Sequence, residues 1–148
     1  MKSNPKTSSS FTTILHEGPN LVILFESEQN LIYANWLGPQ DETAIRAGGT
    51  AMIDAMNAMS RAHGCTKVLN DNRQVEGVWG HSVDWAAKEW LPAMVDAGLA
   101  SFAWVLSKTA VVNMSGVRMR IRADTSTTET MATFPDEATA QAWLASRE

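Results

Sequence analysis

The sequence predicts a single α/β domain with a mixed sheet of four to six strands, in which an N-terminal antiparallel hairpin is followed by a βαβαβα alternation. Three observations support this fold class. Two runs rich in β-branched and aromatic residues lie close together near the N-terminus, apolar residues at helical spacing then alternate with short apolar runs, and 148 residues is the size of one domain. Helices are expected to pack on the sheet through right-handed crossovers.

The N-terminal part supplies the first strands. Residues 1–10 are mostly polar, which predicts a disordered tail before a single domain over residues 11–148. Residues 11–15 are a strand candidate. Residues 21–25 and 31–36 are the predicted antiparallel hairpin, because a short polar segment separates two strand-like runs.

A long helix is predicted after Gly38-Pro39, which is expected to break the preceding strand. Asp41 and Glu42 place negative charge at the helix start, and Gly64 supplies the stop. The methionines of this helix suit a plain core better than a pliable ligand wall. The inward face is predicted from helical spacing to contain Ile45, Gly48, Met52, Ala55, Met56, Met59 and Ala62.

The second helix is predicted to begin at Ser82, a good N-cap residue. Pro92 lies inside this helix and cannot donate a backbone hydrogen bond, so a kink is expected near residues 88–91. Trp85 and Trp90 are five positions apart, a spacing that does not place two side chains on one face of an α-helix. We therefore expect one indole to pack on the sheet and the other to be partly exposed.

The C-terminal part continues the alternation. Residues 101–106 are almost wholly apolar, as in a central strand that is covered on both faces. Residues 109–123 fit either an edge strand or a helix, and the helix is favoured because the preceding strand needs a crossover. Residues 128–134 are the next strand. A final helix is predicted to begin at residues 135–137 and to turn inward Ala140, Trp143 and Leu144.

The composition excludes several classes of partner. A net charge of −4 and a pI near 5.3 argue against nucleic acid and anionic membrane as partners of the whole surface. No apolar run suits an integral membrane segment, and the N-terminus lacks the apolar core of a secretory signal. The single cysteine, Cys65, fits a cytoplasmic location and a buried structural thiol. Metal-ligand spacings and dinucleotide or phosphate-loop motifs are absent from the sequence, so no cofactor is expected.

The polar residues after the apolar pair Val68-Leu69 are the candidate binding site. A strand over residues 67–70 is expected to end there, with a loop that runs to Gly80. Polar groups at such a point typically edge a crevice in an open α/β sheet, and an arginine can grip a carboxylate or phosphate through two hydrogen bonds. The predicted ligand-binding residues are Asn70, Asp71, Asn72, Arg73, Trp79 and His81.

Each of these residues also has a simpler interpretation. The asparagines and the aspartate can satisfy a turn, and an ion pair between Asp71 and Arg73 can do no more than order the loop. Trp79 is either a lid over the core or a stacking surface for a ligand. Asp71 and His81 could act as a carboxylate–base pair, but no activated serine or cysteine accompanies them, so no catalytic residue is predicted.

Five segments of the chain carry a family resemblance: VLNDNR (68–73), GVW (77–79), EWLP (89–92), AGL (97–99) and FAWV (102–105). They resemble the STAS-like group, small proteins similar to bacterial anti-sigma-factor antagonists and more distantly to CRAL-TRIO lipid-transfer domains. The resemblance covers residues 14–144, nearly the whole domain, and its most specific motif lies between Asn70 and Trp79. It implies a STAS-like fold in a branch whose function is unknown. Regulatory antagonists carry a phosphorylatable serine after a sheet strand, and residues 70–73 contain no serine or threonine.

The sequence therefore predicts a non-enzymatic binding or regulatory domain that takes a small anionic or amphipathic, lipid-like molecule in this crevice. This hypothesis predicts a cavity between sheet and helices lined by Met52, Met56 or nearby apolar groups. The alternative is a protein–protein interaction module, acting as a homodimer or in a regulatory complex, with an exposed apolar patch that includes Trp85 or Trp90. A hydrolase-like enzyme is the third hypothesis and requires the aspartate–histidine pair to meet in a cleft.

Overall fold

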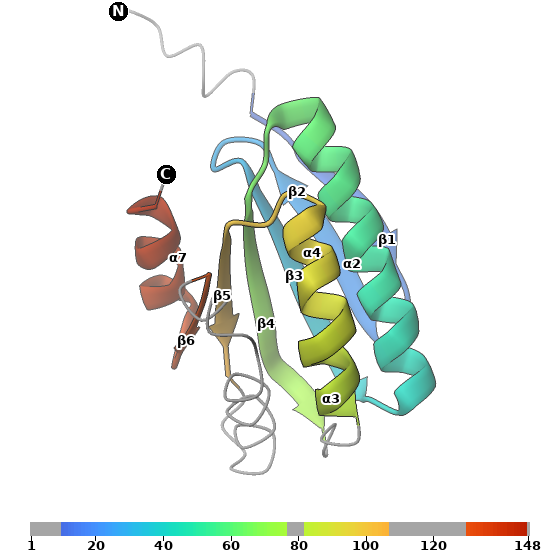
Figure 1. The fold of residues 1–148 in the computed structure, drawn as a ribbon. Helices are drawn as coiled ribbons and strands as arrows, with labels where there is room; N and C mark the ends of the chain where they lie inside the picture. The colour runs from blue at the N-terminus through green and yellow to red at the C-terminus, as the bar shows by residue number, and fades with distance from the viewer. Residues whose placement is uncertain (1–9, 77–81, 107–129, 148) are drawn as a thin grey trace, which may run out of the picture.

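The fold is a mixed β-sheet with helices on both faces. The computed structural model describes residues 10–76, 82–106 and 130–147 (Figure 1). Among these residues the sheet has six strands in the sequential order β1-β2-β3-β4-β5-β6, with β1 to β3 antiparallel and β3 to β6 parallel. The predicted α/β class, with its N-terminal hairpin and mixed sheet, is therefore confirmed. The strands are β1 (Thr12–Glu17), β2 (Leu21–Glu26), β3 (Leu31–Pro39), β4 (Lys67–Glu76), β5 (Ser101–Val105) and β6 (Met131–Phe134).

Helix α2 (Glu42–His63) follows β3 and packs on one face of the sheet. Asp41 is its N-cap, with a side chain that accepts a hydrogen bond from Ala44 N at 2.7 Å. Gly64 ends it in the left-handed conformation, at φ 65°, as predicted. The predicted inward residues are buried as far as Met56, but Ala62 is exposed because the last turn of the helix extends beyond the core.

The predicted ends of two strands are wrong, and the two errors share one cause. Strand β4 does not end at Asn70 but continues to Glu76, and Gly38-Pro39 does not break β3. The two strands pair in parallel along this extra length, up to Pro39 opposite Glu76. Pairing satisfies backbone groups that a loop would have to leave to water, so each extension supports the other.

The second helical segment contains a π-helical turn. It consists of α3 (Val83–Trp85), the π turn η2 (Ala86–Trp90) and α4 (Leu91–Asp96). The irregularity that Pro92 predicted near residues 88–91 takes this form. Because the turn is wider than an α-helical turn, residues five positions apart come into line.

That widening brings both indoles of this segment to the same place on α2. A Cβ added at Gly49 would lie 2.7 Å from Cη2 of Trp85 and 2.9 Å from Cδ1 of Trp90. The prediction that these two side chains cannot share a face is therefore wrong. The expected difference in exposure is confirmed, since Trp90 is buried and Trp85 is half-buried.

The core is divided by the sheet into two clusters. The larger one lies under α2, η2 and α4, and the smaller one lies under α7 (Glu137–Ala145), which covers the other face of β4 to β6 (Figure 1). Ala140 and Leu144 are buried there, as predicted, and Trp143 is half-buried. The segment 109–123 and residues 1–9 lie outside the described residues. Within the described part of the chain, no helix is long and apolar enough to cross a membrane.

Candidate functional site

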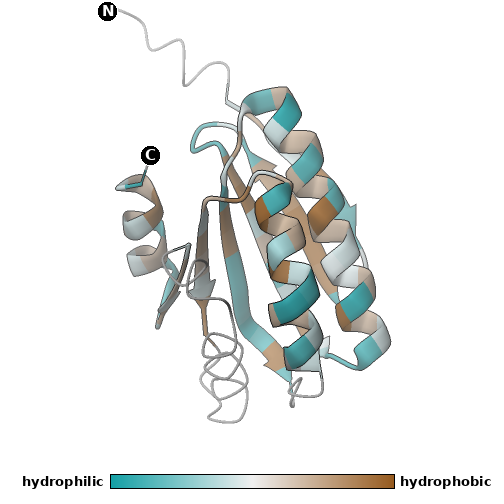
Figure 2. Ribbon diagram, in the orientation of Figure 1, coloured by the Kyte–Doolittle hydropathy of each residue, from teal (hydrophilic) through white to brown (hydrophobic). Residues whose placement is uncertain are grey.

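The polar stretch of β4 is split between the two faces of the sheet. Figure 2 shows it as a hydrophilic interruption in a strand whose neighbours are mostly hydrophobic. Side chains alternate along a strand. Asn70 and Asn72 accordingly point towards α2 and η2, whereas Asp71 and Arg73 point towards α7, where Arg73 contacts Glu137. The structure therefore does not bring the four predicted binding residues into one crevice.

The face towards α7 carries a closed ionic network. Arg73 donates from Nε to Oδ1 of Asp71 at 2.9 Å and from Nη2 to Oδ2 at 2.6 Å. The hydroxyl of Tyr33 donates to the same Oδ2 at 2.6 Å, and Arg73 Nη2 also reaches Oε1 of Glu137 at 3.1 Å. The predicted ion pair between Asp71 and Arg73 is thus present, but it lies within strand β4 and does not order a loop.

The protonation states in this network follow from burial and pairing. Burial raises the pKa of the Asp71 carboxyl, but the hydrogen bonds from Arg73 and Tyr33 outweigh it and hold that pKa below its usual value. Burial and the neighbouring Asp71 carboxylate raise the pKa of the Tyr33 hydroxyl. Arg73 therefore faces two carboxylates, and an added anion would have to displace them to gain its two hydrogen bonds.

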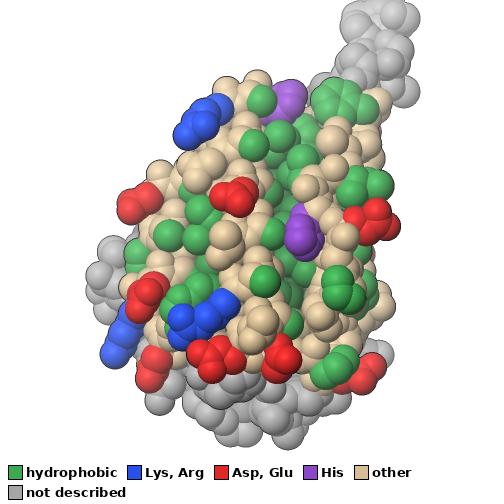
Figure 3. Space-filling model, turned by 90° about the vertical axis from the view of Figure 1, so that its right-hand side faces the viewer, with side chains coloured by type: hydrophobic (Ala, Val, Ile, Leu, Met, Phe, Trp, Pro, Cys, Tyr) green, Lys and Arg blue, Asp and Glu red, His purple; other side chains and the backbone are tan. Residues whose placement is uncertain are grey.

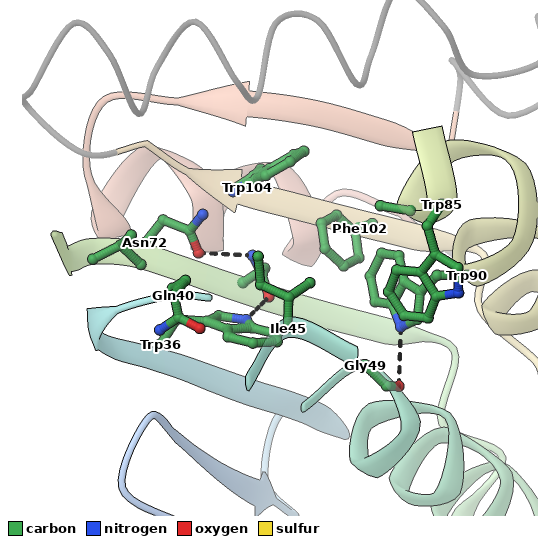
Figure 4. A pocket seen from close by; sticks show the side chains of 12 residues that line it. Trp36, Gln40, Ile45, Gly49, Asn72, Trp85, Trp90, Phe102 and Trp104 are labelled. Atoms are coloured by element: carbon green, nitrogen blue, oxygen red, sulfur yellow. Dashed lines mark hydrogen bonds between the residues drawn. The ribbon is translucent and has the colours of Figure 1, made fainter. Parts of the chain in front are cut away.

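The opposite face of β4 borders a cavity between the sheet and the helices (Figure 4). Its volume is about 50 Å³. Such a volume holds a few waters or one small functional group. Twelve of the described residues line it, and five of them are aromatic: Trp36, Trp85, Trp90, Phe102 and Trp104.

Two glycines of α2 make room for these rings. A Cβ added at Gly48 would lie 2.6 Å from the ring of Trp36, and one at Gly49 would overlap the two indoles of the π turn. Trp90 also donates from Nε1 to the carbonyl oxygen of Gly49 at 3.0 Å. The glycine pair and the π turn thus act together, because each lets large rings approach the helix closely.

Three amides form the polar part of the cavity wall: Gln40, Asn70 and Asn72. Trp36 donates from Nε1 to Oδ1 of Asn70 at 2.7 Å, and Asn70 donates from Nδ2 to Oδ1 of Asn72 at 3.1 Å. Gln40 is 5% exposed, and its Oε1 is buried without a hydrogen-bond partner among the described residues. Asn30, Asn35 and Ser82 also carry a buried acceptor without a partner among the described residues, but of these four residues only Gln40 lines the cavity, where a ligand or water would complete it.

The cavity lies at the carboxyl ends of parallel strands. Gln40 follows β3, Asn72 and Val75 lie in the second half of β4, and Trp104 lies near the end of β5. Ligands of open α/β sheets bind at this edge. Among the described residues that line the cavity, Trp85 alone is half-buried and the others are buried. Its indole therefore stands at the mouth of the cavity.

The sequence located part of this site. Asn70 and Asn72 line the cavity, Asp71 and Arg73 do not, and Trp79 and His81 lie outside the described residues. Sequence reasoning missed Gln40 and the gathering of aromatic rings from four elements, β3, α3, η2 and β5. One local signal was available: two adjacent glycines inside a helix usually have a packing or functional reason.

Other candidate groups are structural. Met52 and Met56 are buried in the core and do not line this cavity, which nearby apolar groups line instead. Cys65 is buried, as predicted, and burial raises the pKa of its thiol. Among the described residues, no three His, Cys, Asp or Glu side chains come together in a way that could hold a metal ion.

Comparison with known proteins adds no relative. No protein-family model, no curated protein and no solved structure matches this chain.

Proposed function

We propose that this chain is a non-enzymatic binding domain whose site is the tryptophan-lined cavity between the sheet and helices α2 and η2. Its ligand is a small amphipathic molecule with an apolar body and a polar end. The observation that carries the proposal is an aromatic wall beside a buried acceptor, Oε1 of Gln40, that has no hydrogen-bond partner in the part of the chain that the structure describes. Apolar walls with a few well-placed polar groups are typical of small-molecule sites.

The cost of building the cavity supports the same proposal. A glycine inside a helix destabilises it by roughly 1 kcal/mol relative to alanine, and Gly48 and Gly49 are both inside α2. The π turn over Ala86–Trp90 is a rare conformation that occurs frequently at functional sites. Local rules are broken most often where function requires it, and here three such breaks surround one cavity.

The chemistry of the lining favours binding over catalysis. The described side chains around the cavity are indoles, amides and hydrocarbons, none of which exchanges protons near neutral pH. The anionic ligand that Arg73 suggested has less support, because Arg73 already contacts the carboxylates of Asp71 and Glu137 on the other face.

We also propose that the chain is STAS-like, as the resemblance of residues 14–144 suggests. The N-terminal antiparallel strands followed by parallel strands and helices are compatible with that family. Residues 70–73, where a regulatory antagonist would carry its serine, contain none, and Asn70, Asp71 and Asn72 are buried in β4. Regulation by phosphorylation at this position is therefore not part of the proposal.

A cavity-filling variant tests the proposed function. Ala86 is buried and lines the cavity, so Ala86→Leu should occupy much of it. Binding of small amphipathic compounds would be followed by intrinsic tryptophan fluorescence and by thermal shift. We expect compounds that bind the parent to lose at least about tenfold in affinity with Ala86→Leu. Ala142→Leu, the same change at an exposed position of α7, is the matched control and should bind like the parent. Unchanged affinity in Ala86→Leu would contradict the proposal.

A second candidate function is self-association through β1. This edge strand exposes Ile14 (60%), and Phe11 beside it is 48% exposed. Figure 3 shows hydrophobic side chains reaching the surface on the side of the molecule where α2 and β1 lie. An uncovered edge strand with apolar side chains is a template for pairing with a second copy. Analytical ultracentrifugation tests it: a dimer that Ile14→Lys converts to monomer would support it, and a monomeric parent at high concentration would contradict it.

A further inference from the structure

The orientation of Gln40 fixes what its free atom is. Its Nε2 donates to the carbonyl oxygens of Leu37 at 3.0 Å and of Asn20 at 3.3 Å. A flipped amide would place its oxygen against two carbonyl oxygens, which repel it. The atom left over is therefore an acceptor, Oε1, and it is buried.

The neighbouring amides are oriented in the same way by a one-directional chain of donors. The indole Nε1 of Trp36 can only donate, so the atom of Asn70 that faces it must be Oδ1. Asn70 then presents its Nδ2 to Asn72, which must accept through its own Oδ1. This leaves Nδ2 of Asn72, a donor, without a partner among the described residues.

One buried acceptor and one donor thus remain on two side chains that line the same end of the cavity. Figure 4 shows Gln40 and Asn72 together near Trp36, away from Trp85 and Trp90. Resting on the proposed function, we infer that the cavity recognises a neutral carboxamide or lactam group. The N–H of that group donates to Gln40 Oε1, its C=O accepts from Asn72 Nδ2, and its apolar body lies among the indoles.

The same two atoms discriminate against charged analogues. A carboxylate offers only acceptors, so it would meet the Gln40 oxygen with another oxygen. An amidinium offers only donors and would leave Asn72 Nδ2 unpaired. A polar group buried against the wrong partner loses roughly tenfold or more in affinity. A benzene-sized ring occupied a cavity of about 150 Å³ in an engineered protein. The space here is about 50 Å³, so a ring requires Trp85, which is half-buried, to shift outward.

The test is a set of isosteric probes: benzamide, benzoate and benzamidinium, with acetamide and acetate as ring-free analogues. Binding would be measured by tryptophan fluorescence and by chemical-shift perturbation of the Gln40 and Asn72 side-chain amides. We expect benzamide to bind at least about tenfold more tightly than either charged probe, and acetamide to perturb both amides more than acetate does.

Asn72→Asp sharpens the test. An aspartate keeps the oxygen that accepts from Asn70 and replaces only the free donor by an acceptor. The preference should therefore reverse from benzamide to benzamidinium. Asn57→Asp, on α2 outside the lining, is the matched control and should keep the parent's preference. Circular dichroism confirms that each variant is folded. In a parallel measurement, Gln40→Met removes the acceptor and should weaken the binding of benzamide.

The possible outcomes separate this inference from the proposed function. Equal affinity for the three benzene derivatives, or no reversal in a folded Asn72→Asp, overturns the carboxamide inference while leaving an apolar binding cavity. Binding of other amphipathic compounds but not of benzamide or acetamide does the same. A parent that binds none of the probes or compounds, and whose cavity holds water alone, overturns both.

Discussion

The two faces of β4 differ although they are built from four consecutive residues. Towards α7, Asp71 and Arg73 complete one another and involve Tyr33 and Glu137, so each charge has a partner. Towards α2 and η2, Nδ2 of Asn72 and the buried Oε1 of Gln40 have no hydrogen-bond partner among the described residues. A closed network stabilises the fold, whereas an incomplete one beside a cavity is available to a ligand.

This difference also reassigns the arginine. The sequence predicted that Arg73 grips a carboxylate or phosphate. In the structure it neutralises Asp71, which is 1% exposed. Arg73 and its sequence neighbour Asn72 therefore have different roles: Arg73 stabilises the fold, and Asn72 lines the cavity.

The largest expected effect comes from Arg73→Ala. It leaves the buried carboxylate of Asp71 with only the hydroxyl of Tyr33 and a backbone N–H. We expect a loss of about 2–4 kcal/mol in the free energy of unfolding, below the range for a fully buried pair because the Arg73 side chain is 39% exposed. Urea denaturation measures it. Arg46→Ala removes a solvent-exposed pair with Glu42 and should cost less than about 1 kcal/mol. Equal losses in the two variants would mean that the network towards α7 stabilises the fold no more than a solvent-exposed ion pair does.

The next effect concerns the glycine under the indoles. Gly49→Ala normally favours a helix, but here its Cβ would overlap Trp85 and Trp90. We expect a net loss of about 1–3 kcal/mol together with a blue or red shift in tryptophan emission as the rings move. Thr50→Ala, at the exposed next position, should be neutral or slightly stabilising. A stabilised Gly49→Ala with unchanged emission would show that the cavity wall does not depend on this close approach.

The smallest effect is the pH dependence of stability that the carboxyl of Asp71 contributes. The pKa of Asp71 is lowered from 3.8 on folding, so its contribution to stability is complete above that value and is lost as the pH falls below it. The parent should therefore lose stability between about pH 5 and pH 2 more steeply than Asp71→Asn does.

Asp136 must be separated from this effect, because its pKa is also lowered, by hydrogen bonds from Thr139 at the start of α7. Asp136→Asn measures that share. If Asp71→Asn has the same acid profile as the parent, Asp71 is not the group whose ionisation stabilises the fold. The unfolding midpoint in urea, followed at each pH, is the appropriate measurement.

Signals carried by near neighbours in sequence predicted the element types well. The helix start at Asp41-Glu42, the stop at Gly64 and the apolar run of β5 depend on a few adjacent residues, and each is present in the structure. The end of β4 was missed because a strand is as long as the partner that pairs with it, and that partner, β3, is distant in the chain.

The candidate site divides in the same way. Composition and polar clustering pointed to residues 70–73, and two of these four residues line the cavity. Strand alternation assigned the other two to the far face once β4 was known to continue through them. Trp85 and Trp90 are five positions apart, and their indoles come into line only because of the π turn. Gln40 lines the same cavity only because β3 continues its pairing with β4 as far as Pro39. Local periodicity and capping thus determine which elements form. Strand pairing and packing decide which side chains meet, because those contacts join residues that are far apart in the sequence and are not specified by their sequence neighbours.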